Sequence, residues 1–170
     1  MKTSIVTFLI TFCFYLSAYA QASQDKAAEL KEQALSSLKQ KDYIKARYLF
    51  KKAYEAFAAR ENYPQAIECG IQANALYVRE NFYKEGFELC RDMEQFIWTG
   101  EQKQKKVFYD LRFPISKERL QMYIALKNPA QAKNQLDKLE EMAKLAKNDS
   151  LMEVLLLSLI HISEPTRQAE

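Results

Sequence analysis

Histidine is almost absent from this chain of 170 residues, whose only example is His161, close to the C-terminus. Since His161 lies in a C-terminal segment that is set aside below as non-native, the rest of the chain has no histidine for Ser-His-Asp or Cys-His catalysis or for the common histidine-containing zinc sites. Glycine is equally scarce: Gly70, Gly86 and Gly100 stand singly, so the chain has no glycine-rich phosphate loop. The neighbouring acids at Asp92–Glu94 and at Glu140–Glu141 are expected on solvated helix faces, without the desolvating pocket that a general acid needs. The sequence therefore predicts no enzyme, no cofactor and no metal site.

Cysteine is also rare. Cys13 lies in the apolar N-terminal stretch, which leaves Cys69 and Cys90 without CxxC or zinc-type spacing. Both lie on predicted helices among apolar residues, where thiols commonly act as small hydrophobes. Two alternatives stay open: a disulfide between Cys69 and Cys90, which export would permit, and two buried free thiols.

The charge balance decides little about partners, because 25 basic and 22 acidic residues give a net charge of only +3. One cluster is strongly basic and contains a single acid, Asp42; its members are Lys39, Lys41, Lys45, Arg47, Lys51 and Lys52. It could be a patch for acidic peptides, anionic lipid or nucleic acid. We favour the simpler interpretation, a water-facing helix surface.

The first twenty residues have the three parts of a secretory signal peptide. Lys2 supplies the positive charge, residues 5–16 are apolar, and Ala18-Tyr19-Ala20 forms a small-residue cleavage site. The apolar run is short for a membrane span and is followed at once by polar residues. We expect residues 1–20 to be removed and the protein to be exported to the periplasm or cell envelope; an uncleaved anchor is the alternative.

The C-terminal residues break the helical pattern. Leu157–Arg167 reads LSLIHISEPTR and resembles the one-frame translation of a transposon-based sequencing adapter. Such segments are set aside before fold reasoning. We therefore expect residues 157–170 to be a non-native tail, and the native chain to be truncated here at about Leu156. The alternative is a genuine helix that ends in a Ser-Glu-Pro-Thr turn.

Helix-forming residues dominate what remains, and no stretch alternates between apolar and polar residues as a strand would. From Lys41 to Ala58, large and small apolar residues recur every three or four positions, which places them on one helix face: Tyr43, Ala46, Phe50, Ala53 and Phe57. The same frame returns at Tyr83, Gly86, Cys90 and Met93, and at Pro129, Ala132, Leu136 and Leu139. Short turns are expected at Lys41-Asp42 and Asn81-Phe82. The fold class is predicted to be all-α.

This Tyr-x-x-Ala-x-x-x-Phe-x-x-Ala frame resembles the second helix of a tetratricopeptide (TPR) unit. The resemblance implies an α-solenoid of antiparallel helix hairpins over residues 21–156, truncated after about three units. A plain antiparallel helical bundle with accidental spacing is the alternative. Residues 148–150 would cap the first helix of a fourth unit.

Three boundaries are expected between the second and third frames. Gly100 is predicted to stop a helix, and residues 101–106 to open another one. Pro114 is predicted to interrupt or kink that helix. Ser116 is predicted to be the N-cap of the next.

By the same resemblance, the first helix of each hairpin lines a concave surface that holds a peptide. The positions that match this groove are Lys31, Leu35, Ile71, Ala75, Val78, Lys117, Gln121 and Ile124. The usual pattern is kept at Leu30 and Ala34 but not at Gly70, Asn74, Ser116 and Leu120.

The expected function is therefore a non-enzymatic protein-interaction scaffold outside the cytoplasm, with an unidentified protein or peptide partner. The chain from Ser116 to Leu151 is also similar to exported bacterial TPR proteins, some of which continue into a membrane helix and a cytoplasmic module. The alternative is thus the sensory segment of a transmembrane transcriptional regulator. A third possibility is an accessory subunit of an envelope enzyme. Nucleic acid is not an expected partner of this segment, and membrane contact is expected only through the signal peptide or a missing C-terminal helix.

Overall fold

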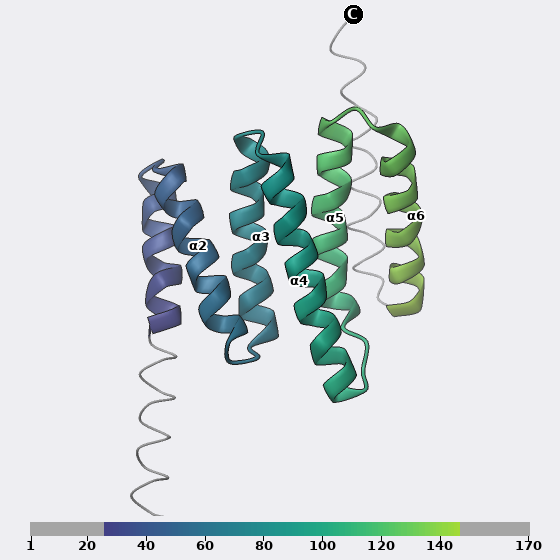
Figure 1. The fold of residues 1–170 in the computed structure, drawn as a ribbon, viewed down its shortest axis with the longest axis horizontal. Helices are drawn as coiled ribbons and strands as arrows, with labels where there is room; N and C mark the ends of the chain where they lie inside the picture. The colour runs from purple at the N-terminus through teal and green to yellow at the C-terminus, as the bar shows by residue number, and fades with distance from the viewer. Residues whose placement is uncertain (1–25, 147–170) are drawn as a thin grey trace, which may run out of the picture. The chain divides into compact units, whose positions relative to one another are not determined.

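The protein is represented by a computed structural model that describes residues 26–146. The described chain is all-α, without a strand, and confirms the predicted fold class (Figure 1). A first helix covers residues 26–39. It is followed by α2 (Tyr43–Ala58), α3 (Tyr63–Arg79), α4 (Tyr83–Gln104), α5 (Tyr109–Ala125) and α6 (Pro129–Ala146). None of the described helices is both long enough and apolar enough to cross a membrane.

The chain divides into two compact units, residues 1–69 and residues 70–170, with the division inside α3. The described part of the first unit contains the helix over residues 26–39, α2 and the start of α3. The second contains the rest of α3 and α4 to α6. The predicted signal peptide, the predicted fourth-unit helix and the predicted adapter-derived tail lie outside the described residues.

Four of the turns between helices share one construction. A non-glycine residue with positive φ ends each preceding helix: Lys41 (62°), Glu61 (57°), Asn81 (63°) and Lys127 (53°). The next backbone amide then donates to a carbonyl five residues back, from Asp42 to Ser37 (3.0 Å), Asn62 to Phe57 (3.1 Å), Phe82 to Tyr77 (2.9 Å) and Asn128 to Tyr123 (2.9 Å). This is the Schellman arrangement, which satisfies carbonyls at the helix end.

Three of these turns are closed by a side-chain cap on the following helix. Asp42 Oδ1 accepts from the Lys45 amide at 3.1 Å, and Asn62 and Asn128 accept in the same way three residues ahead, at 3.4 and 3.2 Å. Phe82 has no side chain that could do so. The predicted turns at residues 41–42 and 81–82 are confirmed.

Replacing Lys41 by glycine is expected to raise the free energy of unfolding by about 0.5–1 kcal/mol. A side chain at positive φ costs about 1–2 kcal/mol, part of which glycine loses again through its greater freedom in the unfolded chain. Asn81→Gly is the matched control and should give no gain. Asparagine tolerates this conformation, and Asn81 also accepts a hydrogen bond from the Tyr83 hydroxyl at 2.8 Å. Urea denaturation measures the free energy of unfolding of both variants. Equal effects of the two substitutions would contradict the explanation.

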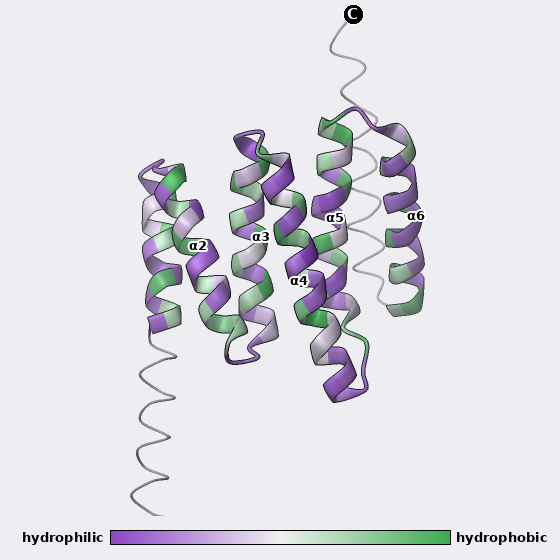
Figure 2. Cartoon of the chain, viewed as in Figure 1, coloured by the Kyte–Doolittle hydropathy of each residue, from purple (hydrophilic) through white to green (hydrophobic). Residues whose placement is uncertain are grey.

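The stripe on α2 packs as its spacing predicts. Ala46, Phe50, Ala53 and Phe57 are buried, with Phe50 fully inaccessible to solvent, while Tyr43 is partly exposed. The opposite face carries most of the predicted basic cluster, whose lysines are all exposed. Figure 2 shows that apolar and polar residues alternate around every described helix. The buried residues of α2 lie on one side of that helix.

The second frame is packed just as closely, around Gly86. Gly86, Cys90 and Met93 on α4 are all buried. A Cβ at Gly86 would lie 2.8 Å from the Met122 sulfur and 3.0 Å from Asn74 Oδ1, and both of those side chains are fully buried. Glycine is thus the residue that lets α4 approach α3 and α5 at this point.

The boundaries predicted at Gly100, at residues 101–106 and at Ser116 are wrong, and Pro114 does not interrupt its helix. Gly100 does not stop α4, which continues to Gln104 and ends at Lys105 in the left-handed conformation. No helix opens at residues 101–106, because α5 begins at Tyr109 and passes through Pro114. Ser116 is buried within α5 and is not an N-cap.

Packing explains these differences. A glycine costs a helix about 1 kcal/mol and a proline about 3 kcal/mol. Ile97, Gly100 and Glu101 are buried in the last turns of α4, and Phe113 and Ile115 are buried on either side of Pro114. These tertiary contacts outweigh the local preference.

Candidate functional site: a cleft lined by α4, α5 and α6

The residues predicted from the TPR frame are all partly or fully exposed, on three helices. On the first helix, Lys31 is engaged within its own unit: its Nζ is 3.0 Å from Gln65 Oε1 and 2.7 Å from Glu68 Oε1. Leu35 lies one turn later and is partly exposed. Lys31 is therefore a contact between two helices, which agrees with a packing role better than with ligand binding.

The other six predicted residues belong to the second unit. Ile71, Ala75 and Val78 follow one face of α3, and Lys117, Gln121 and Ile124 follow one face of α5. These helices are joined by a buried hydrogen bond of 2.9 Å between Asn74 Nδ2 and Glu118 Oε2. The structure therefore brings the two faces onto neighbouring helices.

Ile124 also has a packing role. It lies against the buried cluster of Phe113, Leu120, Leu139 and Ala143 that joins α5 to α6. It lines an apolar hollow of about 510 Å³ between these helices, together with Leu120, Ala132 and Leu136.

A larger cleft, which sequence analysis did not predict, lies along α4, α5 and α6. Its volume is about 710 Å³. Each helix contributes residues three or four positions apart, so the cleft follows one face of each. The lining residues are Arg91, Glu94, Gln95, Trp98 and Glu101 from α4; Val107 before α5; Tyr109, Arg112, Ser116 and Arg119 from α5; and Gln135, Lys138, Glu141, Met142 and Leu145 from α6.

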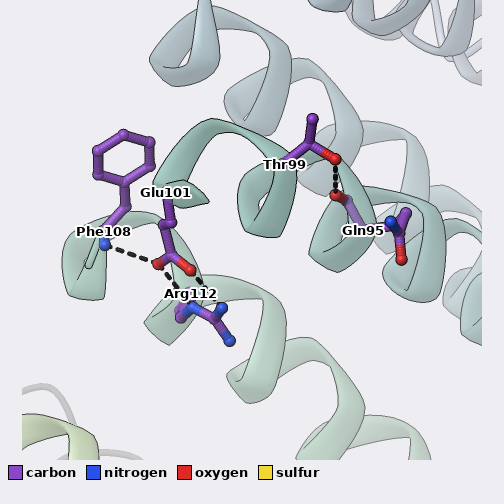
Figure 3. Close-up of polar contacts among 5 residues, drawn as sticks. All are labelled: Gln95, Thr99, Glu101, Phe108 and Arg112. Atoms are coloured by element: carbon purple, nitrogen blue, oxygen red, sulfur yellow. Dashed lines mark hydrogen bonds and ion pairs between the residues drawn. The ribbon is translucent and has the colours of Figure 1, made fainter. Parts of the chain in front are cut away.

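One end of the cleft is fixed by Glu101 (Figure 3). Its carboxylate accepts from the Phe108 amide at 2.8 Å and from Arg112 Nε at 2.7 Å, and it also pairs with Arg112 Nη2. Glu101 is only 6% exposed. Burial by itself would raise the pKa of Glu101, but the hydrogen bonds from Arg112 and Phe108 and the Arg112 charge outweigh it, so the pKa is lowered. The same pairing raises the pKa of Arg112.

A second ion pair crosses the floor of the cleft, where Arg119 Nη2 lies 3.1 Å from Glu94 Oε2. Glu94 was expected to be a solvated carboxylate, and the structure instead pairs it with a neighbouring helix. The two ion pairs occupy two acids and two bases of the lining. They hold α4 to α5, and they leave the remaining charges of the lining to face solvent.

Cys69 and Cys90 are buried free thiols in the structure. Burial raises the pKa of the Cys69 thiol to about 11 and that of Cys90 to about 12. Such thiols are almost entirely protonated near neutral pH and are poor nucleophiles. Neither cysteine therefore contributes a reactive group to the cleft.

Among residues 26–146, no group of three or more histidine, cysteine, aspartate or glutamate side chains could hold a metal ion. The lining combines exposed aromatic and aliphatic surface with charged groups. The comparisons with protein-family models, curated proteins and solved structures found no match for the chain.

Proposed function

We propose that this protein is an exported, non-enzymatic protein-interaction scaffold built from TPR-like helix hairpins. The observation that carries the proposal is the repeated turn. Turns with the same backbone hydrogen bonds and a residue of positive φ occur at residues 41, 61, 81 and 127. A chain that repeats one helix–turn–helix unit cannot bury its apolar stripes within a single hairpin, so neighbouring units stack.

Export rests on the signal-like residues 1–20, and the interaction role rests on the surfaces just described. Helical repeats of this kind act by presenting extended surfaces to partners. The second unit has such a surface in the cleft of about 710 Å³, which is large enough to bury several side chains of a peptide. The sensory segment of a transmembrane regulator stays the alternative, and no contact among the described residues favours it.

Selection of a random linear-peptide library on the immobilised full chain tests the interaction role. A peptide-binding surface should enrich a family of related sequences that bind in solution with micromolar or tighter affinity. Heat-denatured chain serves as the control and should enrich none of them. If repeated selections yield no common pattern, the proposed role as a peptide-binding scaffold is wrong.

A further inference from the structure

The cleft shows the same side-chain order on α4 and on α6. Arg91 on α4 is followed by Glu94 and then by Trp98. On α6, Lys138 is followed at the same intervals by Glu141 and Leu145. A cation therefore precedes a large apolar residue by seven positions on both walls, which is about 10 Å along a helix.

Helices α4 and α6 run in the same direction, since α5 lies between them in the chain and returns antiparallel to both (Figure 1). The two cations consequently lie toward one end of the cleft and the two apolar residues toward the other. The apolar end is open to solvent: Trp98 is 51% exposed and Leu145 56% exposed. Val107 adds further exposed apolar surface there.

The two cations at the other end of the cleft, Arg91 and Lys138, are not held in close ion pairs. Two of the three lining acids, Glu94 and Glu101, are taken by Arg119 and Arg112. Lys138 makes no ion pair with any described residue, and Arg91 has only a loose contact of 3.9 Å with Asp92, its neighbour in sequence. Glu141 is the one remaining acid of the lining, and the whole lining has four basic and three acidic side chains.

We infer that the cleft binds a protein segment that carries a carboxylate side chain and a large apolar side chain about 10 Å apart. The carboxylate lies between Arg91 and Lys138, and the apolar side chain packs on Trp98 and Leu145. The spacing corresponds to seven residues in a helical segment and to three in an extended one. This inference rests on the proposed interaction role, and it places the partner between second helices of the hairpins, apart from the first-helix surface predicted above.

Charge exchange tests the inference. The peptides selected on the full chain should contain aspartate or glutamate three or seven residues from a large apolar residue. Arg91→Glu combined with Lys138→Glu should weaken their binding at least about fivefold, because attraction becomes repulsion at both positions. Replacing the peptide acid by lysine should restore binding to this double variant. Lys45→Glu with Lys84→Glu changes the net charge equally at exposed positions outside the cleft and should alter binding less than about twofold.

The apolar end is tested by Trp98→Ala, with Tyr48→Ala on α2 as the control for loss of an exposed aromatic residue. Only Trp98→Ala should weaken peptide binding. Far-UV circular dichroism of each variant verifies that the helices are intact. Selected peptides that lack acids, or that bind the Arg91/Lys138 double variant as tightly as the unaltered chain, would overturn this inference and leave the interaction role standing. Failure to select any peptide would overturn both.

Discussion

Replacing Phe50 by alanine is expected to lower the free energy of unfolding by about 3–5 kcal/mol, a large share of the stability of a small domain. Phe50 is fully buried at the centre of the α2 stripe, where its neighbours on the same face, Ala46 and Ala53, are also inaccessible. Alanine would remove the transfer free energy of the ring and leave a cavity that small, fully packed neighbours cannot fill.

The control for Phe50→Ala is Tyr48→Ala, on the opposite side of the same helix. Tyr48 is 61% exposed, so its loss should change stability by less than about 0.5 kcal/mol. Urea denaturation followed by far-UV circular dichroism measures both variants. A similar loss for Tyr48→Ala would mean that the buried face of α2 has been assigned to the wrong side.

The second large effect is expected at Glu118, the buried acid that links α5 to Asn74 on α3. Burial raises the pKa of Glu118, although the Asn74 hydrogen bond and the Lys117 charge act in the opposite direction. Glu118→Ala would leave the Asn74 amide, which is fully buried, without its partner. The free energy of unfolding is expected to fall by about 1–3 kcal/mol, because an unsatisfied buried polar group keeps its desolvation penalty.

Glu118→Gln should behave differently and should make stability less dependent on pH. Glutamine still accepts from Asn74 Nδ2, and it adds an N–H that can reach Asn74 Oδ1, a buried atom with no hydrogen-bond partner. Since the folded pKa is raised, the stabilising contribution of Glu118 is complete below its ordinary value of 4.5 and is lost as pH rises through the folded value. The advantage of Glu118→Gln over the unaltered chain should therefore grow with pH above about 4.5.

The measurement is a set of urea denaturation curves between acid and neutral pH for both Glu118 variants and the unaltered chain. Glu101 contributes with the opposite sign, because its folded pKa is lowered and its stabilisation is lost at low pH. That contribution is common to all three proteins and cancels when differences are taken. A difference between Glu118→Gln and the unaltered chain that stays constant with pH would show that Glu118 does not titrate as described.

Local patterns in the sequence predicted the helices well in the first half of the chain. The apolar frame of α2 and α4 and the turns at residues 41–42 and 81–82 depend on contacts within a few residues, and the structure has them as expected. Gly100 does not stop α4 and Pro114 does not interrupt α5, because local preference there is weaker than the packing of buried Ile97, Glu101 and Phe113.

The cleft was missed for a related reason. The pairs Glu101–Arg112 and Glu94–Arg119 join residues on different helices, and helical periodicity does not reveal which charges meet across such a distance. One signal was present in the sequence, the matching order of cation, acid and apolar residue at Arg91 and at Lys138. It shows only when the two helix faces are compared with each other.

The shared turn geometry has a consequence for how such a gene can change in length. The segment of residues 42–81 begins just after one such turn and ends in the next. Lys41 and Asn81 have the same left-handed conformation, and the backbone hydrogen bonds around them are the same. Unequal recombination that deletes or duplicates this segment would join one existing helix end to another existing helix start. The protein could thereby lose or gain two helices without having to evolve a new loop.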